Sequence, residues 1–166
     1  MIVVGCSGVV KGTATIDSAD APAYRSSASL SSEASAASSS ARESERQVAV
    51  TTAAIHSSCD ALGASSGESV QAVNAYVDAY NAEAPDAPNK IGPAVDALNH
   101  SADLVSSSLS PPLPSGLTDA LNGWVTAARQ LAGLLPRNPG PDEFNAAIRQ
   151  LNDSKTAAGA ACQAAY

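Results

Sequence analysis

The chain has 166 residues, a formal net charge of −7 and 4% aromatic residues. This acidic balance argues against a nucleic-acid-binding protein, which needs a basic surface, and against electrostatic adhesion to anionic lipid. The length suits one domain. Ala and Ser dominate, and no run of residues alternates as a strand would, so the composition predicts an all-α protein.

The segment 26–62 contains neither Gly nor Pro and predicts one long helix. A row of small and apolar residues runs along one face of it at alternating spacings of four and three. The row consists of Leu30, Ala34, Ala37, Ala41, Ser44, Val48, Thr51, Ile55, Cys59 and Leu62. It becomes strongly apolar only from Val48. We therefore expect a Ser/Ala-rich helical stalk or frayed segment over residues 26–44 and a bundle domain over 45–166. At about 1.5 Å per residue the helix extends roughly 54 Å, longer than those that follow, and should overhang them.

Four shorter helices are predicted after the first one. Gly63 is expected to cap the first helix, and Ser65 to open the second, which ends before Pro85. The third begins between residues 89 and 93 and stops at Pro111. The apolar rows of the last three helices are Ile91, Val95, Leu98, Ala102, Val105 and Leu109; then Leu117, Leu121, Trp124, Ala128, Leu131 and Leu135; then Phe144, Ile148, Leu151, Ala158 and Cys162. Short connections favour antiparallel neighbours. The prediction is an up-and-down bundle of four to five helices with an extended first helix.

Three cysteines are present, and none belongs to a Cys-x-x-Cys pair. In a five-helix bundle the first and fifth helices point the same way. Cys59 and Cys162 then reach the same end, where an oxidising compartment allows a disulfide. Cys6 remains, with a separate role.

The N-terminal stretch Val3-Val4-Gly5-Cys6 resembles a bacterial lipobox, and residues 7–14 look like the start of small mycobacterial and related actinobacterial lipoproteins. The resemblance implies a signal peptide cleaved before Cys6 and acylation, including palmitate, on that cysteine. It also implies an extracytoplasmic protein anchored to the cell membrane, or secreted. Residues 1–25 would be this start followed by a flexible tether.

Catalytic and metal-binding patterns are weak throughout the chain. Residues 63–67 match the Gly-x-Ser-x-Gly elbow of hydrolases, but a helix precedes them where a strand is required. Asp96, His100 and Asp103 share a helix face and read as a solvated surface. His56 and Cys59 supply only two ligands where a structural zinc site needs four. We expect no enzyme activity, no cofactor and no metal.

Three aromatic residues are candidates to face a ligand. Tyr76 and Tyr80 lie one helical turn apart, where they either line a groove or pack, and Trp124 lies on a core stripe. The hypothesis is a membrane-tethered binding or interaction protein of the cell envelope, with a protein or envelope-component partner. The alternative is a structural or assembly subunit of an envelope complex, and a hydrolase is a more remote third reading.

Overall fold

The computed structural model describes residues 21–166, with side-chain surroundings from residue 29 onward. The four α-helices of this part are α1 (Ala21–Asn81), α2 (Ala87–Ser108), α3 (Ser115–Leu134) and α4 (Pro141–Ala165), and the short 3₁₀ helix η1 (Leu135–Arg137) follows α3. Cys6 and its lipobox-like surroundings lie outside the described residues. Residues 46–166 form one compact unit, and the division from the preceding unit falls at Glu45, within α1.

The Ser/Ala-rich beginning of α1 is helical, and every described residue from Ser29 to Val50 is exposed. Ala has the highest helix propensity. The serines bond back along the same helix, as the Ser35 hydroxyl does to the Ser31 carbonyl at 2.9 Å. The helix begins at Ala21, so its first five residues fall within the range 1–25 that the sequence assigned to the start and tether. Val48 is 66% exposed, so the packed part starts later than its apolar side chain indicated.

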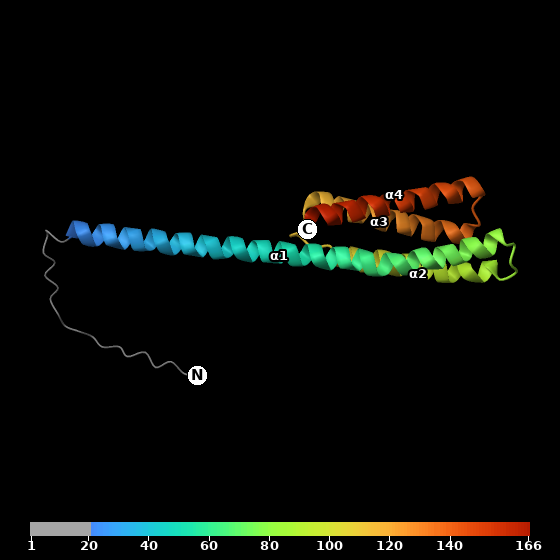
Figure 1. Ribbon diagram of the computed structural model, residues 1–166, viewed down its shortest axis with the longest axis horizontal. Coiled ribbons are helices and arrows are strands. Elements are labelled where there is room, and N and C mark those ends of the chain that lie inside the picture. The colour runs from blue at the N-terminus through green and yellow to red at the C-terminus, as the bar shows by residue number, and fades with distance from the viewer. Residues whose placement is uncertain (1–20) are drawn as a thin grey trace, which may run out of the picture. The chain divides into compact units, whose positions relative to one another are not determined.

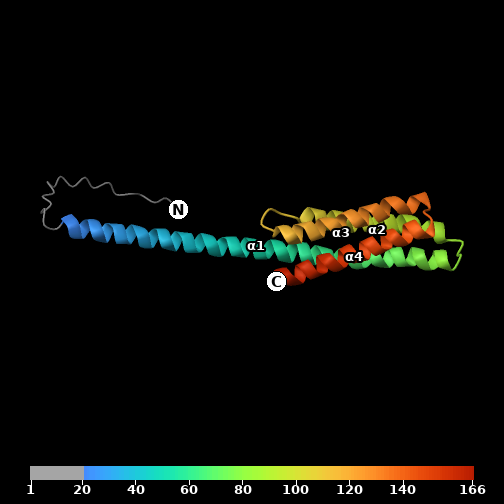
Figure 2. The same cartoon turned by 90° about the horizontal axis from the view of Figure 1, so that it is seen from above.

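The second half of α1 packs with α2, α3 and α4 in an up-and-down bundle, as the sequence predicted (Figures 1 and 2). α3 packs against both α2 and α4, and it contributes three of the largest fully buried side chains, Leu121, Trp124 and Leu131. The buried residues of α3 are Leu117, Leu121, Trp124, Val125, Ala127, Ala128, Leu131, Ala132 and Leu134. The core therefore centres on the apolar row that the sequence predicted for this helix.

The predicted break at Gly63 is wrong, because α1 continues through it to Asn81. A glycine cap needs a left-handed backbone, and no glycine in the described range has a positive φ. Gly63 and Gly67 each cost about 1 kcal/mol relative to Ala in a helix, but both lie on the exposed side. The predicted cap Ser65 is instead buried within the helix, where its hydroxyl donates to the Ala61 carbonyl at 2.6 Å.

Buried serines carry the α1 core face across the predicted break. The face repeats at spacings of four and three, which is the pattern of a helix that packs along its whole length. Its buried positions are Ile55, Ser58, Cys59, Leu62, Ser65, Ser66, Ser69, Val73 and Tyr76. The polar serines in the middle of this row concealed it from an analysis based on apolar residues.

α1 ends in a Schellman motif, a turn in which two backbone amides close the last carbonyls of a helix. The Ala84 amide donates to the Ala79 carbonyl at 2.9 Å, and the Glu83 amide donates to the Tyr80 carbonyl at 3.1 Å. Glu83 occupies the left-handed position, with φ 50°, where Gly is usual. α2 then begins at Ala87, earlier than predicted, because Pro88 fits its first turn. Pro93 lies inside the helix.

Small residues set the contact between α1 and α2. The Ser58 hydroxyl donates to the Ser108 carbonyl at 2.9 Å, which fixes the antiparallel register of the two helices. Steps of one heptad along both helices keep that register. From this register we infer that Ser65 faces Ser101, Ala72 faces Ala94, and Ala79 faces Ala87. Because every one of them is Ser or Ala, the two backbones can approach closely.

Ser101 in this seam is the one residue whose buried side-chain oxygen lacks a hydrogen-bond partner within the described residues. An unsatisfied buried hydroxyl costs about 1–3 kcal/mol. We therefore expect Ser101→Ala to raise the free energy of unfolding by about 1 kcal/mol in urea denaturation. The exposed Ser107→Ala is the control and should change stability little. A clear loss of stability in Ser101→Ala would contradict an orphaned hydroxyl.

Candidate functional site

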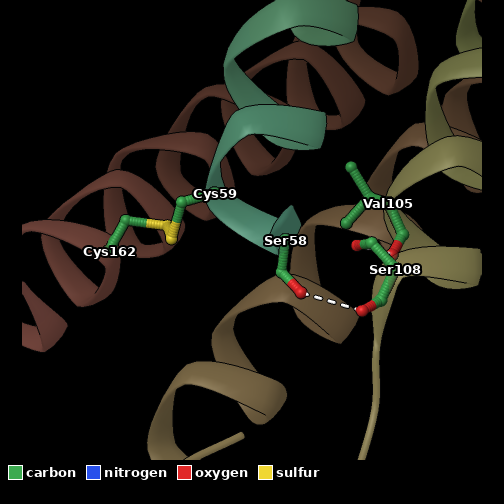
Figure 3. The surroundings of a disulfide bond; sticks show 5 residues. All are labelled: Ser58, Cys59, Val105, Ser108 and Cys162. Atoms are coloured by element: carbon green, nitrogen blue, oxygen red, sulfur yellow. Dashed lines mark hydrogen bonds between the residues drawn. A yellow bond between two sulfur atoms is a disulfide. The ribbon is translucent and has the colours of Figure 1, made fainter. Parts of the chain in front are cut away.

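Cys59 and Cys162 form a disulfide between α1 and α4, with their Cα atoms 5.8 Å apart (Figure 3). The predicted pairing is therefore present, but the geometric reason given for it was wrong. The described part of the chain has four α-helices, so α4 runs antiparallel to α1 (Figure 1). α4 starts beside the end of α1 and runs back along it, which brings Cys162 to Cys59 in the middle of α1.

The surroundings of the disulfide join three helices. The neighbouring Ser58 bonds to Ser108 at the end of α2 (Figure 3). His56 contacts Tyr166, with ring centroids 4.7 Å apart. A zinc site with His56 and Cys59 is excluded while the sulfur of Cys59 is bonded to Cys162. This region is a structural crosslink, because Cys59, Ser58 and His56 each contact another part of the bundle.

The remaining catalytic and metal patterns are not assembled into a site. Ser65, the would-be hydrolase nucleophile, is buried inside α1. Asp96, His100 and Asp103 are exposed on α2, and Asp103 accepts a hydrogen bond from Arg129 at 2.8 Å. Among the described residues, no three His, Cys, Asp or Glu side chains are placed to hold a metal ion.

Trp124 does not face a ligand. It is 1% exposed, within the hydrophobic core on α3. The prediction that it is ligand-facing is therefore wrong, and the alternative reading of a core residue holds. The reason lies in its spacing: Trp124 shares one helix face with Leu121 and Leu131, which are both completely buried.

Tyr76 and Tyr80 do come together, at a pocket between the last turns of α1 and the start of α4. Their ring centroids are 6.0 Å apart, and the Phe144 ring meets Tyr76 edge-on at 6.0 Å. The pocket has a volume of about 150 Å³. Its lining residues are Tyr76, Val77, Tyr80, Asn81, Pro139, Pro141, Phe144 and Asn145.

The two tyrosines differ in their surroundings. Tyr76 is 6% exposed and Tyr80 is 51% exposed. Burial, together with the neighbouring Tyr80, raises the pKa of the Tyr76 phenol above its usual range. The hydroxyl of Tyr76 therefore remains a neutral hydrogen-bond donor at physiological pH. It has no hydrogen-bond partner in the described part of the chain.

The sequence identified part of this pocket only. The one-turn spacing of Tyr76 and Tyr80 was a usable signal, and Phe144 was predicted as a packing residue. Asn81 and Asn145 gave no signal, because one Asn at the end of a helix and another near the start of a distant helix do not reveal that they meet. The antiparallel packing of α4 on α1 brings these residues together.

Together these features define a disulfide-linked four-helix bundle with a small aromatic pocket at one end. Residues 41–163 match the Rv2240c four-helix bundle domain, and the chain belongs to that family. It is also 51% identical over 166 residues to "Uncharacterized protein MT2300" from Mycobacterium tuberculosis (strain CDC 1551 / Oshkosh); the match covers 100% of this chain and 84% of that protein. No solved structure matches. In the described range, no helix is both long and apolar enough to cross a bilayer.

Proposed function

We propose that this chain is a non-catalytic binding protein of the cell envelope. It would be anchored to the outer face of the cytoplasmic membrane through an acylated Cys6. The observation that carries the proposal is the Cys59–Cys162 disulfide. Disulfides of this kind persist in oxidising compartments and are rare in the cytosol. The lipobox-like residues 3–6 suggest how a protein in such a compartment is attached to the membrane.

A binding role is supported by what the bundle contains. Its interior is filled mainly by Leu, Val, Ala and Trp124, and a small pocket without charged side chains lies beside Tyr76. Active sites usually combine a cleft with titratable groups of perturbed pKa. Tyr76 has such a pKa, but no base, acid or nucleophile adjoins it in the pocket. These features favour recognition of a partner or ligand over chemistry on a substrate.

The anchor can be tested in the native membrane with Cys6→Ala. We expect the wild-type protein to partition into detergent and Cys6→Ala to appear in the soluble fraction, because acyl chains on Cys6 insert into the membrane and Ala cannot be acylated. Ser7→Ala is the matched control and should remain in the detergent phase. A Cys6→Ala protein that stays with the membrane would contradict the proposed anchor.

The binding role can be tested by affinity purification of the tethered wild-type protein from its own membrane, followed by identification of what is retained. The proposal predicts a reproducible partner that withstands a salt wash and is absent from a mock purification. Turnover of an envelope substrate by the purified protein would contradict a non-catalytic role.

A further inference from the structure

The pocket at the end of the bundle has the size of a single ring. Its volume is about 150 Å³, and an apolar cavity of about this volume is known to accept benzene. Phe144 and Tyr76 meet edge-on and form an aromatic corner, and the half-exposed Tyr80, whose ring centroid lies 6.0 Å from that of Tyr76, also lines the pocket. The pocket therefore suits the flat face of a six-membered ring.

The charge of the lining restricts the ligand further. No Asp, Glu, Lys or Arg lines the pocket, so neither a cation nor an anion would meet an opposite charge there, and burying an unpaired charge is costly. The net charge of −7 adds repulsion for anions. The expected ligand is neutral.

Polar groups around the aromatic corner add hydrogen-bonding capacity. Asn81 and Asn145 each bring an amide that can both donate and accept. The Tyr76 hydroxyl has no hydrogen-bond partner among the described residues. Unlike the Ser101 hydroxyl it is not fully enclosed, although Tyr76 as a whole is 6% exposed. A simple hydrocarbon ring would leave these groups unused. A ring with an apolar face and a polar rim would use the aromatic side chains and the amides together.

We propose that this pocket binds one neutral pyranose sugar ring, which stacks on Tyr80 and accepts hydrogen bonds from Asn81, Asn145 and the Tyr76 hydroxyl. This inference rests on the proposed binding function and names its ligand class. A second hollow adjoins the first across Tyr80 and Asn81, and it is lined also by Glu83, Ala84 and Ala87. The sugar can therefore be one unit of a longer glycan that continues past Tyr80.

The test is a titration of the full chain with methyl glucopyranoside, methyl mannopyranoside and phenol, followed by NMR of the Asn side-chain amides. We expect a methyl glycoside to bind with a Kd on the order of 1–10 mM, as suits a small ligand with few contacts. Tyr80→Ala should weaken binding about tenfold by removing the stacking surface. Asn145→Ala should weaken it by a smaller factor.

Tyr166→Ala is the matched control, because Tyr166 is also an exposed tyrosine but lies beside His56 near the disulfide. It should leave the sugar affinity unchanged, and circular dichroism should show that all three variants are folded. Phenol binding without sugar binding would overturn the ligand class. Absence of any binding, or sugar binding unaffected by Tyr80→Ala, would overturn the site.

A second titration can show whether the sugar ring belongs to a soluble glycan or to a glycolipid. A soluble neutral oligosaccharide and phosphatidylcholine vesicles containing a neutral monoglycosyl diacylglycerol present the same ring on a polymer and on a lipid. Tighter binding to one of them assigns the source, and equal binding supports recognition of the ring alone. If no sugar binds while Cys6 still anchors the protein and a partner is still retained, only the sugar inference fails.

Discussion

Loss of the Cys59–Cys162 disulfide is expected to lower the free energy of unfolding by about 3–4 kcal/mol, with about 4.7 kcal/mol as the upper limit for a loop of roughly 100 residues. The crosslink joins residues separated by 103 positions, so it restricts most of the bundle in the unfolded chain. The double variant Cys59→Ala and Cys162→Ala should show this loss in urea denaturation.

Reduction of the wild-type protein is a second route to the same loss. A reductant should lower the stability of the wild type to about that of the double variant and leave the double variant unchanged. Ser57→Ala, at an exposed position beside the crosslink, controls for substitution in this part of α1. Equal stability with and without reductant would contradict a structural role for this disulfide.

Leu121→Asp is expected to prevent folding of the bundle. Leu121 is completely buried on α3 between Leu117 and Trp124, where a carboxylate would have no charged partner. The cost is several kcal/mol, comparable with the whole stability of a typical domain, about 5–15 kcal/mol. Circular dichroism should show loss of the cooperative thermal transition.

The matched control for this substitution is Asn122→Asp at the next position, which is exposed. It introduces the same carboxylate at the surface of the same helix and should leave the transition nearly unchanged. A cooperative transition at the wild-type temperature in Leu121→Asp would contradict the assignment of α3 to the centre of the core.

The fold class and the last three helices could be predicted from the sequence, because their buried faces consist of large apolar residues at helical spacing. Leu98, Leu121 and Leu131 are each completely buried, as the pattern indicated. Pro141 correctly marked the start of α4, and Pro111 marked the end of α2 to within a few residues. Pro93 did not, because the helix that it was expected to open begins at Ala87. Local sequence and tertiary packing agree in these helices.

The length of α1 could not be predicted in this way. In the middle of α1, burial of side chains against the other helices outweighs the low helix propensity of the local sequence. Gly63 and Gly67 disfavour a helix, but burial of Leu62 before them and of Val73 and Tyr76 after them offsets that cost. The helix then ends at Asn81, and Glu83 just after it has the left-handed conformation that usually indicates Gly. A sequence pattern based on caps therefore placed an end at Gly63, where a glycine was available.

The candidate pocket was only partly predictable for a related reason. Tyr76 and Tyr80 are neighbours on one helix, so their spacing indicated a shared surface. Asn145 joins them only through the packing of the start of α4 on the end of α1. The prediction instead divided α1 at Gly63 and placed both tyrosines on a separate second helix, with no indication of which helix meets its end. The division of α1 at Gly63 also explains why the Cys59–Cys162 pair was predicted correctly from a wrong geometry, in which the helices of the two cysteines were parallel.

The central proposal is an envelope protein with an acylated N-terminal cysteine and a disulfide-linked bundle. Peptide mass spectrometry of the protein isolated from its native membrane, alkylated without reduction, reads both features at once. The proposal predicts an N-terminal peptide that begins at acylated Cys6 and a crosslinked peptide that contains Cys59 and Cys162. An unmodified Cys6 together with alkylated, free Cys59 and Cys162 would contradict it.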